Sequence, residues 1–208
     1  MEQPYAVRFS VDYPDRALDR LSTLLRIIWV IPIAIVLGSV SGGASQSHNL
    51  NGQETSGAAA GGLLFLAPLL MIVFRRKYPR WWFDWNRELL RFGARVGAYL
   101  ALMDDRYPST DEEQSVHLDI DYPNMPDGLS QWMPLVKWLL AVPHLIVLVF
   151  LWLFAFVAVI VAWFAVLLTG RYPRGLFDFV VGVMRWTYRV IGYAFVLVTD
   201  RYPPFNAA

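Results

Sequence analysis

The sequence contains no cysteine, and this absence excludes several kinds of chemistry. Without thiols the chain forms no disulfide bond, no thiolate metal site and no cysteine nucleophile. Its three histidines, His48, His117 and His144, are too scattered to match a metal-ligand spacing. Phosphate-binding glycine loops, dinucleotide fingerprints and serine-nucleophile motifs are also absent. We therefore expect no cofactor, no metal site and no catalytic residues, and an enzyme finds little support.

The chain also has no large excess of positive or negative charge. The chain has 18 Lys and Arg residues and 17 Asp and Glu residues, so its net charge is +1. This balance argues against nucleic acid as a partner, because phosphate backbones bind strongly basic surfaces. The first ten residues also lack the basic start and apolar core of a signal peptide. We therefore expect a mature N-terminus that is not translocated.

Hydrophobic residues, by contrast, make up 56% of the chain and include nine tryptophans. They fall in long blocks, such as residues 24–40 and 135–169, which is the arrangement typical of a membrane protein. We expect membrane lipids as partners.

Two short segments alternate apolar and polar residues with a period of two. They cover residues 5–13 and 116–122, and a Tyr-Pro pair ends each of them. The pattern is typical of half-buried β-strands. A ribbon of two strands is marginal alone in water. We therefore expect its apolar face to rest on helices or on another chain, or a strand to extend a partner's sheet.

The chain also contains an internal repeat, which predicts a first unit at residues 1–110 and a second at residues 111–208. The matching residues are Arg26 with Lys137, Pro32 with Pro143, Phe83-Asp84 with Phe177-Asp178, and Arg91 with Arg185. The offset falls from 111 to 94 residues along the chain, so the first unit carries 17 additional residues (111 − 94). They fall within residues 39–62, which are rich in Gly, Ser and Asn and predict an exposed loop.

The insertion leads to a prediction of the fold class. Irregular backbone cannot sit halfway along a lipid-exposed helix, so we expect a turn at the matching point of the second unit, near residues 150–154. Residues 135–169 would then form two short spans; the alternative is one continuous tilted helix. The predicted fold is a mainly α, polytopic membrane protein with about four transmembrane helices. Each unit would comprise a short strand, a transmembrane helical hairpin and an interfacial amphipathic helix.

The position of the basic residues predicts the orientation of such a protein. No Lys or Arg falls within residues 39–62 or in the proposed second turn. Basic loops stay on the cytoplasmic side of a membrane. We therefore expect a multi-pass protein of the bacterial plasma membrane, with both termini cytoplasmic and the loop at 39–62 outside.

Each unit has a helical segment with a charged stripe, at residues 82–103 and 176–198. The second is apolar enough that the sequence leaves open whether it is interfacial or spanning. Both stripes place two arginines four residues apart, where like charges repel on an isolated helix. Two explanations remain open: the arginines pair with carboxylates inside the protein, or they hold an anionic lipid headgroup. The candidate residues are Arg91, Arg95, Arg185, Arg189, Asp84 and Asp178.

The repeated Tyr-Pro pairs also have two interpretations. They end helices and strands as structural turns, or they form a surface on which a partner docks. The candidate docking residues are Tyr13, Tyr107, Tyr122, Tyr202 and Arg174.

The second unit carries the blocks V-H-L-D-I-D-Y-P, R-Y-P-R-G-L-F-D and D-R-Y-P-P-F. With these blocks, residues 116–205 resemble the bacterial membrane family known as domain of unknown function 4389. Residues 7–108 resemble a diverged copy, in which Trp81-Trp82 replace Gly175-Leu176 and Ile33 replaces His144. The resemblance implies a small integral membrane protein, often built in tandem. It implies no activity.

From these features we expect a non-enzymatic accessory or scaffold subunit that binds a larger membrane complex through its cytoplasmic strands, Tyr-Pro turns and amphipathic helices. The alternative is a lipid-binding or lipid-transport component that uses the paired arginines. A membrane enzyme is a third and weaker possibility.

Overall fold

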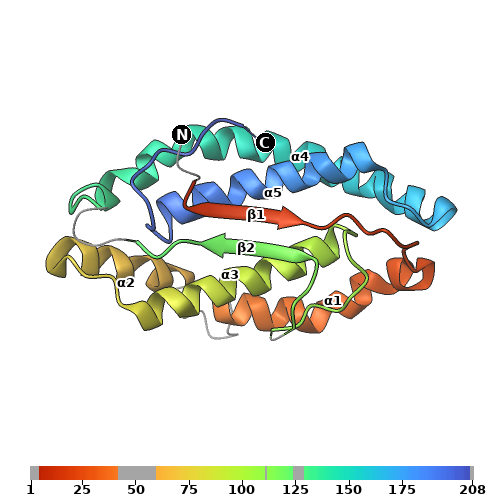
Figure 1. Ribbon diagram of the computed structural model, residues 1–208, viewed down its shortest axis with the longest axis horizontal. Coiled ribbons are helices and arrows are strands. Elements are labelled where there is room, and N and C mark those ends of the chain that lie inside the picture. Colours follow the sequence, from red (N-terminus) through yellow and green to blue (C-terminus); the bar gives the residue numbers. More distant parts are fainter. Residues whose placement is uncertain (1–4, 42–59, 111, 124–128, 207–208) are drawn as a thin grey trace, which may run out of the picture.

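The computed structural model describes residues 5–41, 60–110, 112–123 and 129–206. Five helices and two strands follow one another along these residues (Figure 1). In chain order they are β1 (Val7–Val11), α1 (Arg20–Ser41), α2 (Ala60–Arg75), α3 (Arg80–Leu100), β2 (Val116–Ile120), α4 (Pro134–Thr169) and α5 (Arg174–Ala194).

The two strands form where the alternation predicted them and pair antiparallel, with Phe9 opposite Leu118. In both strands the apolar positions are buried and the polar positions between them are exposed. The apolar face lies against helices, as expected for a ribbon too small to be stable alone. The polar face carries Arg8, Ser10, His117 and Asp119 and points away from the core.

Each strand packs on a helix from the other half of the chain. Strand β1 lies on α5, and β2 lies on α3. The ring centroids of Phe9 and Tyr188 are 5.0 Å apart, so β1 runs closely alongside α5. At one end of this contact a Cβ on Gly192 would lie 2.5 Å from Cγ2 of Val7. A residue without a side chain is therefore needed there for the backbones to approach.

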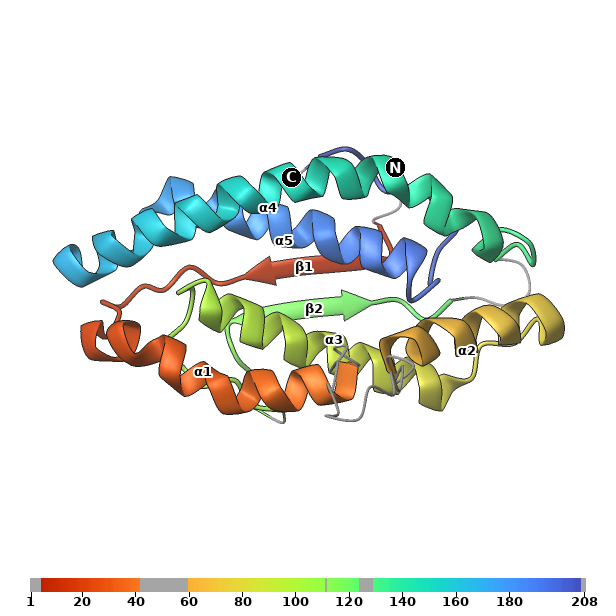
Figure 2. The ribbon, with the colours of Figure 1, turned by 180° about the vertical axis from the view of Figure 1, so that it is seen from behind.

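The remaining helices form an outer layer. Helix α4 packs on α5, α1 packs on α3, and both α1 and α2 contact α4. Figure 1 looks onto the sheet, and Figure 2 looks from behind onto α4, α1 and α2. The order of layers is therefore the sheet, then α3 and α5, then α1, α2 and α4, all along the long axis of the molecule.

The predicted turn near residues 150–154 is wrong. Helix α4 runs without a break over 36 residues, from Pro134 to Thr169. Ala155, Ala158 and Ala162 form one buried stripe along its second half, so the packing continues through the point of the expected turn. The prediction assumed that both halves follow the same path, whereas the described residues of the first half form two helices, α1 and α2, where the second half has α4 alone.

The prediction of about four transmembrane helices is also wrong. Among the described residues, α4 alone is long and apolar enough to cross a membrane, by length and composition. Helix α2 has 16 residues and is about 24 Å long, which is shorter than a hydrocarbon core of about 30 Å. Helix α1 carries Arg26, which is buried in the protein. Residues 42–59 of the predicted outer loop lie outside the described residues.

Candidate functional site

Two of the arginines predicted as a lipid or ion-pair site, Arg91 and Arg185, bind backbone carbonyl groups at the outer edges of the sheet. Nε of Arg91 donates a hydrogen bond to the carbonyl oxygen of Leu118 at 2.8 Å. Nε of Arg185 donates to the carbonyl oxygen of Phe9 at 2.9 Å. One arginine of each pair therefore binds the strand that packs on its own helix.

The register explains why these two carbonyls are available. At the ends of the ribbon, the amide of Asp12 donates to Ser115 and the amide of Asp121 donates to Ala6. Hydrogen-bonded and non-hydrogen-bonded pairs alternate along an antiparallel ladder. Phe9 and Leu118 are therefore a non-hydrogen-bonded pair, and their carbonyls point to the outer edges. With the arginines bound there, the edges are poor templates for an added strand.

The other predicted members of this group are more dispersed. Arg95 donates to the carbonyl oxygen of Ser109 at 2.5 Å, and Arg189 donates to Oδ1 of Asn206 at 2.9 Å. Asp84 lies 3.4 Å from Arg87, whereas Asp178 is exposed near the start of α5. The structure thus brings Arg91 and Arg185 to matching places on the sheet but does not gather the six residues into one site.

Two buried cations hold the outer helices to the turns that follow α3 and α5. Arg26 is 2% exposed. Its guanidinium lies 2.6 Å from Oδ1 of Asp105 and donates to the carbonyl oxygen of Tyr99 at 2.7 Å. Burial lowers the pKa of Arg26, and the charge of Asp105 opposes this shift. The pair therefore keeps a charged group inside the protein at the cost of its desolvation.

The same arrangement recurs at α4. Lys137 is 0% exposed, its Nζ lies 2.7 Å from Oδ1 of Asp200, and it donates to the carbonyl oxygen of Thr199 at 2.8 Å. Nζ also lies 5.3 Å from the ring centroid of Tyr193. Sequence reasoning matched Arg26 with Lys137 but did not pair them with the aspartates. The signal was a basic residue recurring within an apolar block, together with an Asp-Arg-Tyr-Pro sequence at the end of each half.

Two of the proposed docking tyrosines join the strands to the helices. The hydroxyl of Tyr13 donates to the carbonyl oxygen of Tyr172 at 2.5 Å, and the guanidinium carbon of Arg174 lies 4.7 Å from the Tyr13 ring centroid. Tyr122 donates to the carbonyl oxygen of Tyr78 in the same way. These contacts give both tyrosines and Arg174 a structural role, and their part in docking stays a prediction.

The other two docking candidates, Tyr107 and Tyr202, are exposed. The Tyr107 ring packs edge-on to Tyr99, with centroids 5.9 Å apart. The hydroxyl of Tyr202 donates to the carbonyl oxygen of Leu140 at 3.2 Å, and its ring lies 4.7 Å from His144. His144 is fully buried and accepts a hydrogen bond from Nε1 of Trp186 at 3.1 Å.

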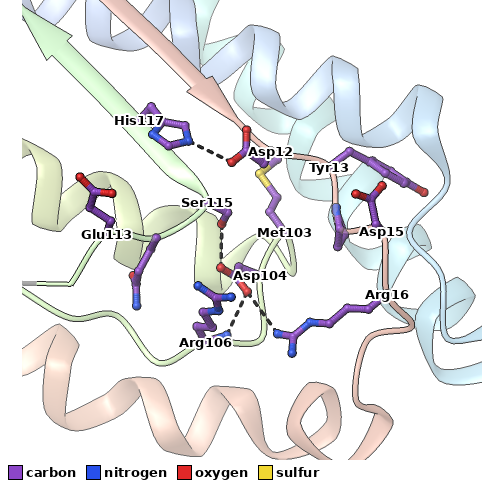
Figure 3. Close-up of a pocket in the computed structure, with 12 residues that line it drawn as sticks. Asp12, Tyr13, Asp15, Arg16, Met103, Asp104, Arg106, Glu113, Ser115 and His117 are labelled. Atoms are coloured by element: carbon purple, nitrogen blue, oxygen red, sulfur yellow. Dashed lines mark hydrogen bonds and ion pairs between the residues drawn. The ribbon is translucent and has the colours of Figure 1, made fainter.

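A polar pocket of about 440 Å³ opens where β1 ends and β2 begins (Figure 3). Nε2 of His117 lies 2.9 Å from Oδ2 of Asp12. The Ser115 hydroxyl donates to Oδ2 of Asp104 at 2.7 Å, and Arg16 lies 3.7 Å from the same carboxylate. Because Ser115 and His117 bind separate carboxylates, the contact that a serine nucleophile makes with its base is not formed. The pocket is a network of charged and polar side chains at the surface, with four carboxylates and two arginines in its lining.

Across the described residues, no three His, Asp or Glu side chains are grouped so that they could hold a metal ion. Residues 132–207 match the family model called Domain of unknown function (DUF4389). The match covers one copy and begins just before α4. The expected resemblance to this family is therefore supported over residues 132–207. No curated protein and no solved structure matches the chain.

Proposed function

We propose that the protein is a non-enzymatic, membrane-associated accessory subunit, held in lipid by its outer helices and presenting the polar face of its sheet to a larger membrane complex. The observation that supports this most is the separation of its two surfaces. From Pro134 to Leu168 the only ionisable residues are Lys137 and His144, and both are buried. The exposed side chains of α4 are large and apolar, including Val149 at 68% and Leu168 at 77%.

The opposite surface, formed by the sheet, is polar and charged. The outward face of the sheet carries paired charges, such as Arg8 with Asp121 at 2.8 Å and Asp119 with Arg91 at 3.3 Å. The pocket of Figure 3 continues this polar surface at one end of the ribbon. A rigid polar face of this kind suits recognition of a protein surface through hydrogen bonds and charge complementarity. We place it on the cytoplasmic side of a bacterial membrane.

A tandem origin is also part of the proposal, with a first unit at 1–110, a second at 111–208 and the strands exchanged between them. Its support is a set of contacts that occur twice. Arg26 with Asp105 corresponds to Lys137 with Asp200. The other recurring contacts are Arg91 to β2 with Arg185 to β1, and Tyr122 to Tyr78 with Tyr13 to Tyr172.

Headgroup binding by the paired arginines remains an alternative proposal. It is weaker because Nε of both Arg91 and Arg185 is engaged by a strand carbonyl. An arginine that lies against the backbone in this way has fewer donors left for a phosphate.

The experiment uses Ser10→Lys, which adds a cation to the exposed sheet face. Gly175→Lys is the matched control, because a Cβ at Gly175 meets nothing within 4 Å. Both variants and the parent are purified in mild detergent from the native membrane. We expect a stoichiometric partner with the parent and the control, and a loss of at least tenfold with Ser10→Lys. Equal retention in all three, or no stoichiometric partner with the parent, would contradict the proposal.

A further inference from the structure

Helix α4 is too long to cross a bilayer at an ordinary tilt. Its 36 residues extend about 54 Å at 1.5 Å per residue. Fitting that length into a hydrocarbon core of about 30 Å needs a tilt of about 56°, which exceeds the range of about 0–40° seen for spanning helices. The apolar surface continues over this whole length, since Leu135 and Leu168 at its two ends are both exposed.

The packing of the sheet raises a second obstacle to crossing. Nε1 of Trp152, at the middle of α4, donates to Oγ1 of Thr187 at 3.0 Å. Tyr188, which follows Thr187 in α5, packs on Phe9 of β1. A crossing α4 would therefore carry the neighbouring Arg8, with its partner Asp121, close to the depth of the bilayer centre. A charged side chain there costs about 2.5–3.5 kcal/mol or more.

Basic residues lie near both ends of α4, where an in-plane helix would bring them to lipid headgroups. Arg20 donates to the carbonyl oxygen of Leu168 at 3.1 Å, and Arg171 is exposed just beyond the helix. At the opposite end Nε of Arg76 donates to Gln131 at 2.7 Å, and Arg75 beside it is exposed. Cations at both ends of an apolar surface match an anionic membrane surface.

We infer that α4 lies in the plane of the membrane, with its outer face in one leaflet and the sheet turned toward water. The inference rests on the membrane association proposed above and adds the orientation. Lipid is the occupant of this face because it needs no polar partner. A protein interface would carry about one hydrogen bond per 100–200 Å². The exposed side chains of α4 before Thr169 offer only the indole N–H groups of Trp138 and Trp152, and the second of these already binds Thr187.

A depth profile along α4 tests the orientation. The native chain has no cysteine, so a single nitroxide label can be placed at one position at a time. Leu139, Ile146, Leu153 and Ile160 are exposed and spaced seven residues apart, which keeps them on one side of the helix. Each labelled variant is reconstituted in vesicles of zwitterionic and anionic phospholipid. Label depth is measured from relaxation by oxygen and by a water-soluble nickel complex.

An in-plane helix predicts the same depth at the four positions, within about 5 Å. A crossing helix predicts depths that change by up to about 10 Å from one position to the next, with a maximum in the middle. That profile would overturn the orientation and leave membrane association intact. If the labels reach neither reagent, a second copy or another protein covers the face, and the inference fails. If the labels are in water and the vesicles carry no protein on flotation, the membrane part of the proposed function fails as well.

Ser10→Cys supplies the control. Its label lies on the polar face of the sheet, so the nickel complex should relax it at the rate of an aqueous site in the same vesicles. A label at Ser10 protected from the nickel complex would also contradict the in-plane orientation.

Discussion

The outer helices differ more between the two halves of the chain than do the inner helices and strands that they cover. In the first half the outer layer is divided between α1 and α2, whereas α4 is continuous in the second. Beneath them, α3 and α5 have 21 residues each and carry strands paired in one register. The difference indicates that the inner contacts determine the fold. The outer layer can differ between the halves because its exposed side does not contact the core.

The two buried cations offer the strongest test of this comparison. Arg26→Met leaves Asp105 without its charged partner, and Lys137→Met does the same to Asp200. Removing one member of a buried ion pair costs about 3–5 kcal/mol. We expect a loss of this size for Arg26→Met and a somewhat smaller one for Lys137→Met, because the Asp200 side chain is more exposed. Denaturant unfolding in mild detergent measures both, and a loss below about 1 kcal/mol in each would contradict the structural role.

The two halves have different residues at the position where α5 comes closest to β1. Gly192 of α5 lies against Val7, whereas the corresponding position of α3 is Ala98, which is fully buried. Gly192→Ala should therefore destabilise the protein by about 1–3 kcal/mol through overpacking, although alanine is the better helix former. Ala98→Gly should cost about 1 kcal/mol in helix propensity and about 0.8 kcal/mol more for the loss of a buried methyl group. Thermal unfolding compares the two variants. A stabilising Gly192→Ala would show that β1 lies further from α5.

The arginines at the sheet edges give a smaller effect. Arg185→Met removes a charged donor from the Phe9 carbonyl, and we expect a loss of about 1.5–3 kcal/mol. Arg91→Met should cost a similar amount, because Nε of Arg91 makes the matching bond to the carbonyl oxygen of Leu118. The readout is the free energy of unfolding together with hydrogen exchange in β1 and β2. An unchanged stability with lost affinity for anionic vesicles would favour the headgroup role instead.

Tyr78 and Tyr172 occupy matching positions in the two halves, and their variants should give the smallest difference in the free energy of unfolding. The Tyr78 hydroxyl donates to the carbonyl oxygen of Val196 at 2.8 Å, whereas the buried hydroxyl of Tyr172 has no hydrogen-bond partner among the described residues. Tyr78→Phe should cost about 1 kcal/mol, and Tyr172→Phe should be neutral or stabilising. Chemical denaturation at neutral pH measures both changes. Equal losses would show that the two hydroxyls have equivalent environments.

The same tyrosines predict sensitivity to alkali. Burial raises the pKa of Tyr78 and of Tyr172 above the ordinary value of 10.0. Above about pH 10 the unfolded chain releases these protons while the folded chain keeps them, so the free energy of unfolding falls as the pH rises. Below that pH the contribution is fully present. Replacing both tyrosines with Phe should flatten this decline, which unfolding measured from pH 8 to pH 11 would detect.

The sequence predicted elements better than partners. Alternation located both strands, and the charged stripes located α3 and α5, because each depends on a period within one segment. The same patterns do not specify which helix a strand covers, so the packing of β1 on α5 and of β2 on α3 was not predicted. The carbonyl partners of Arg91 and Arg185 were missed for a similar reason. Backbone acceptors are present at every residue, and register alone decides which of them stay free.

The error over α4 has a different physical origin. Its block of apolar residues has the length of two short helices, and the loop inserted in the first half favoured a turn. The indole N–H of Trp152, which binds Thr187, is the one polar side-chain group within 150–154. It leaves the backbone of a turn there without partners, whereas a helix satisfies its own backbone. Hydropathy also cannot distinguish a crossing helix from one whose narrow buried stripe packs on α5, because both are apolar on every side.

Accessibility measured at Ser10 and Val149 in the same bilayer tests the central separation of polar and apolar surfaces most directly. The two positions lie on opposite surfaces, one on the sheet and the other on the exposed side of α4. Nitroxides at these positions should respond oppositely, with Ser10 relaxed mainly by the aqueous nickel complex and Val149 mainly by oxygen dissolved in lipid. The same response at both positions, in water or in lipid, would contradict the account.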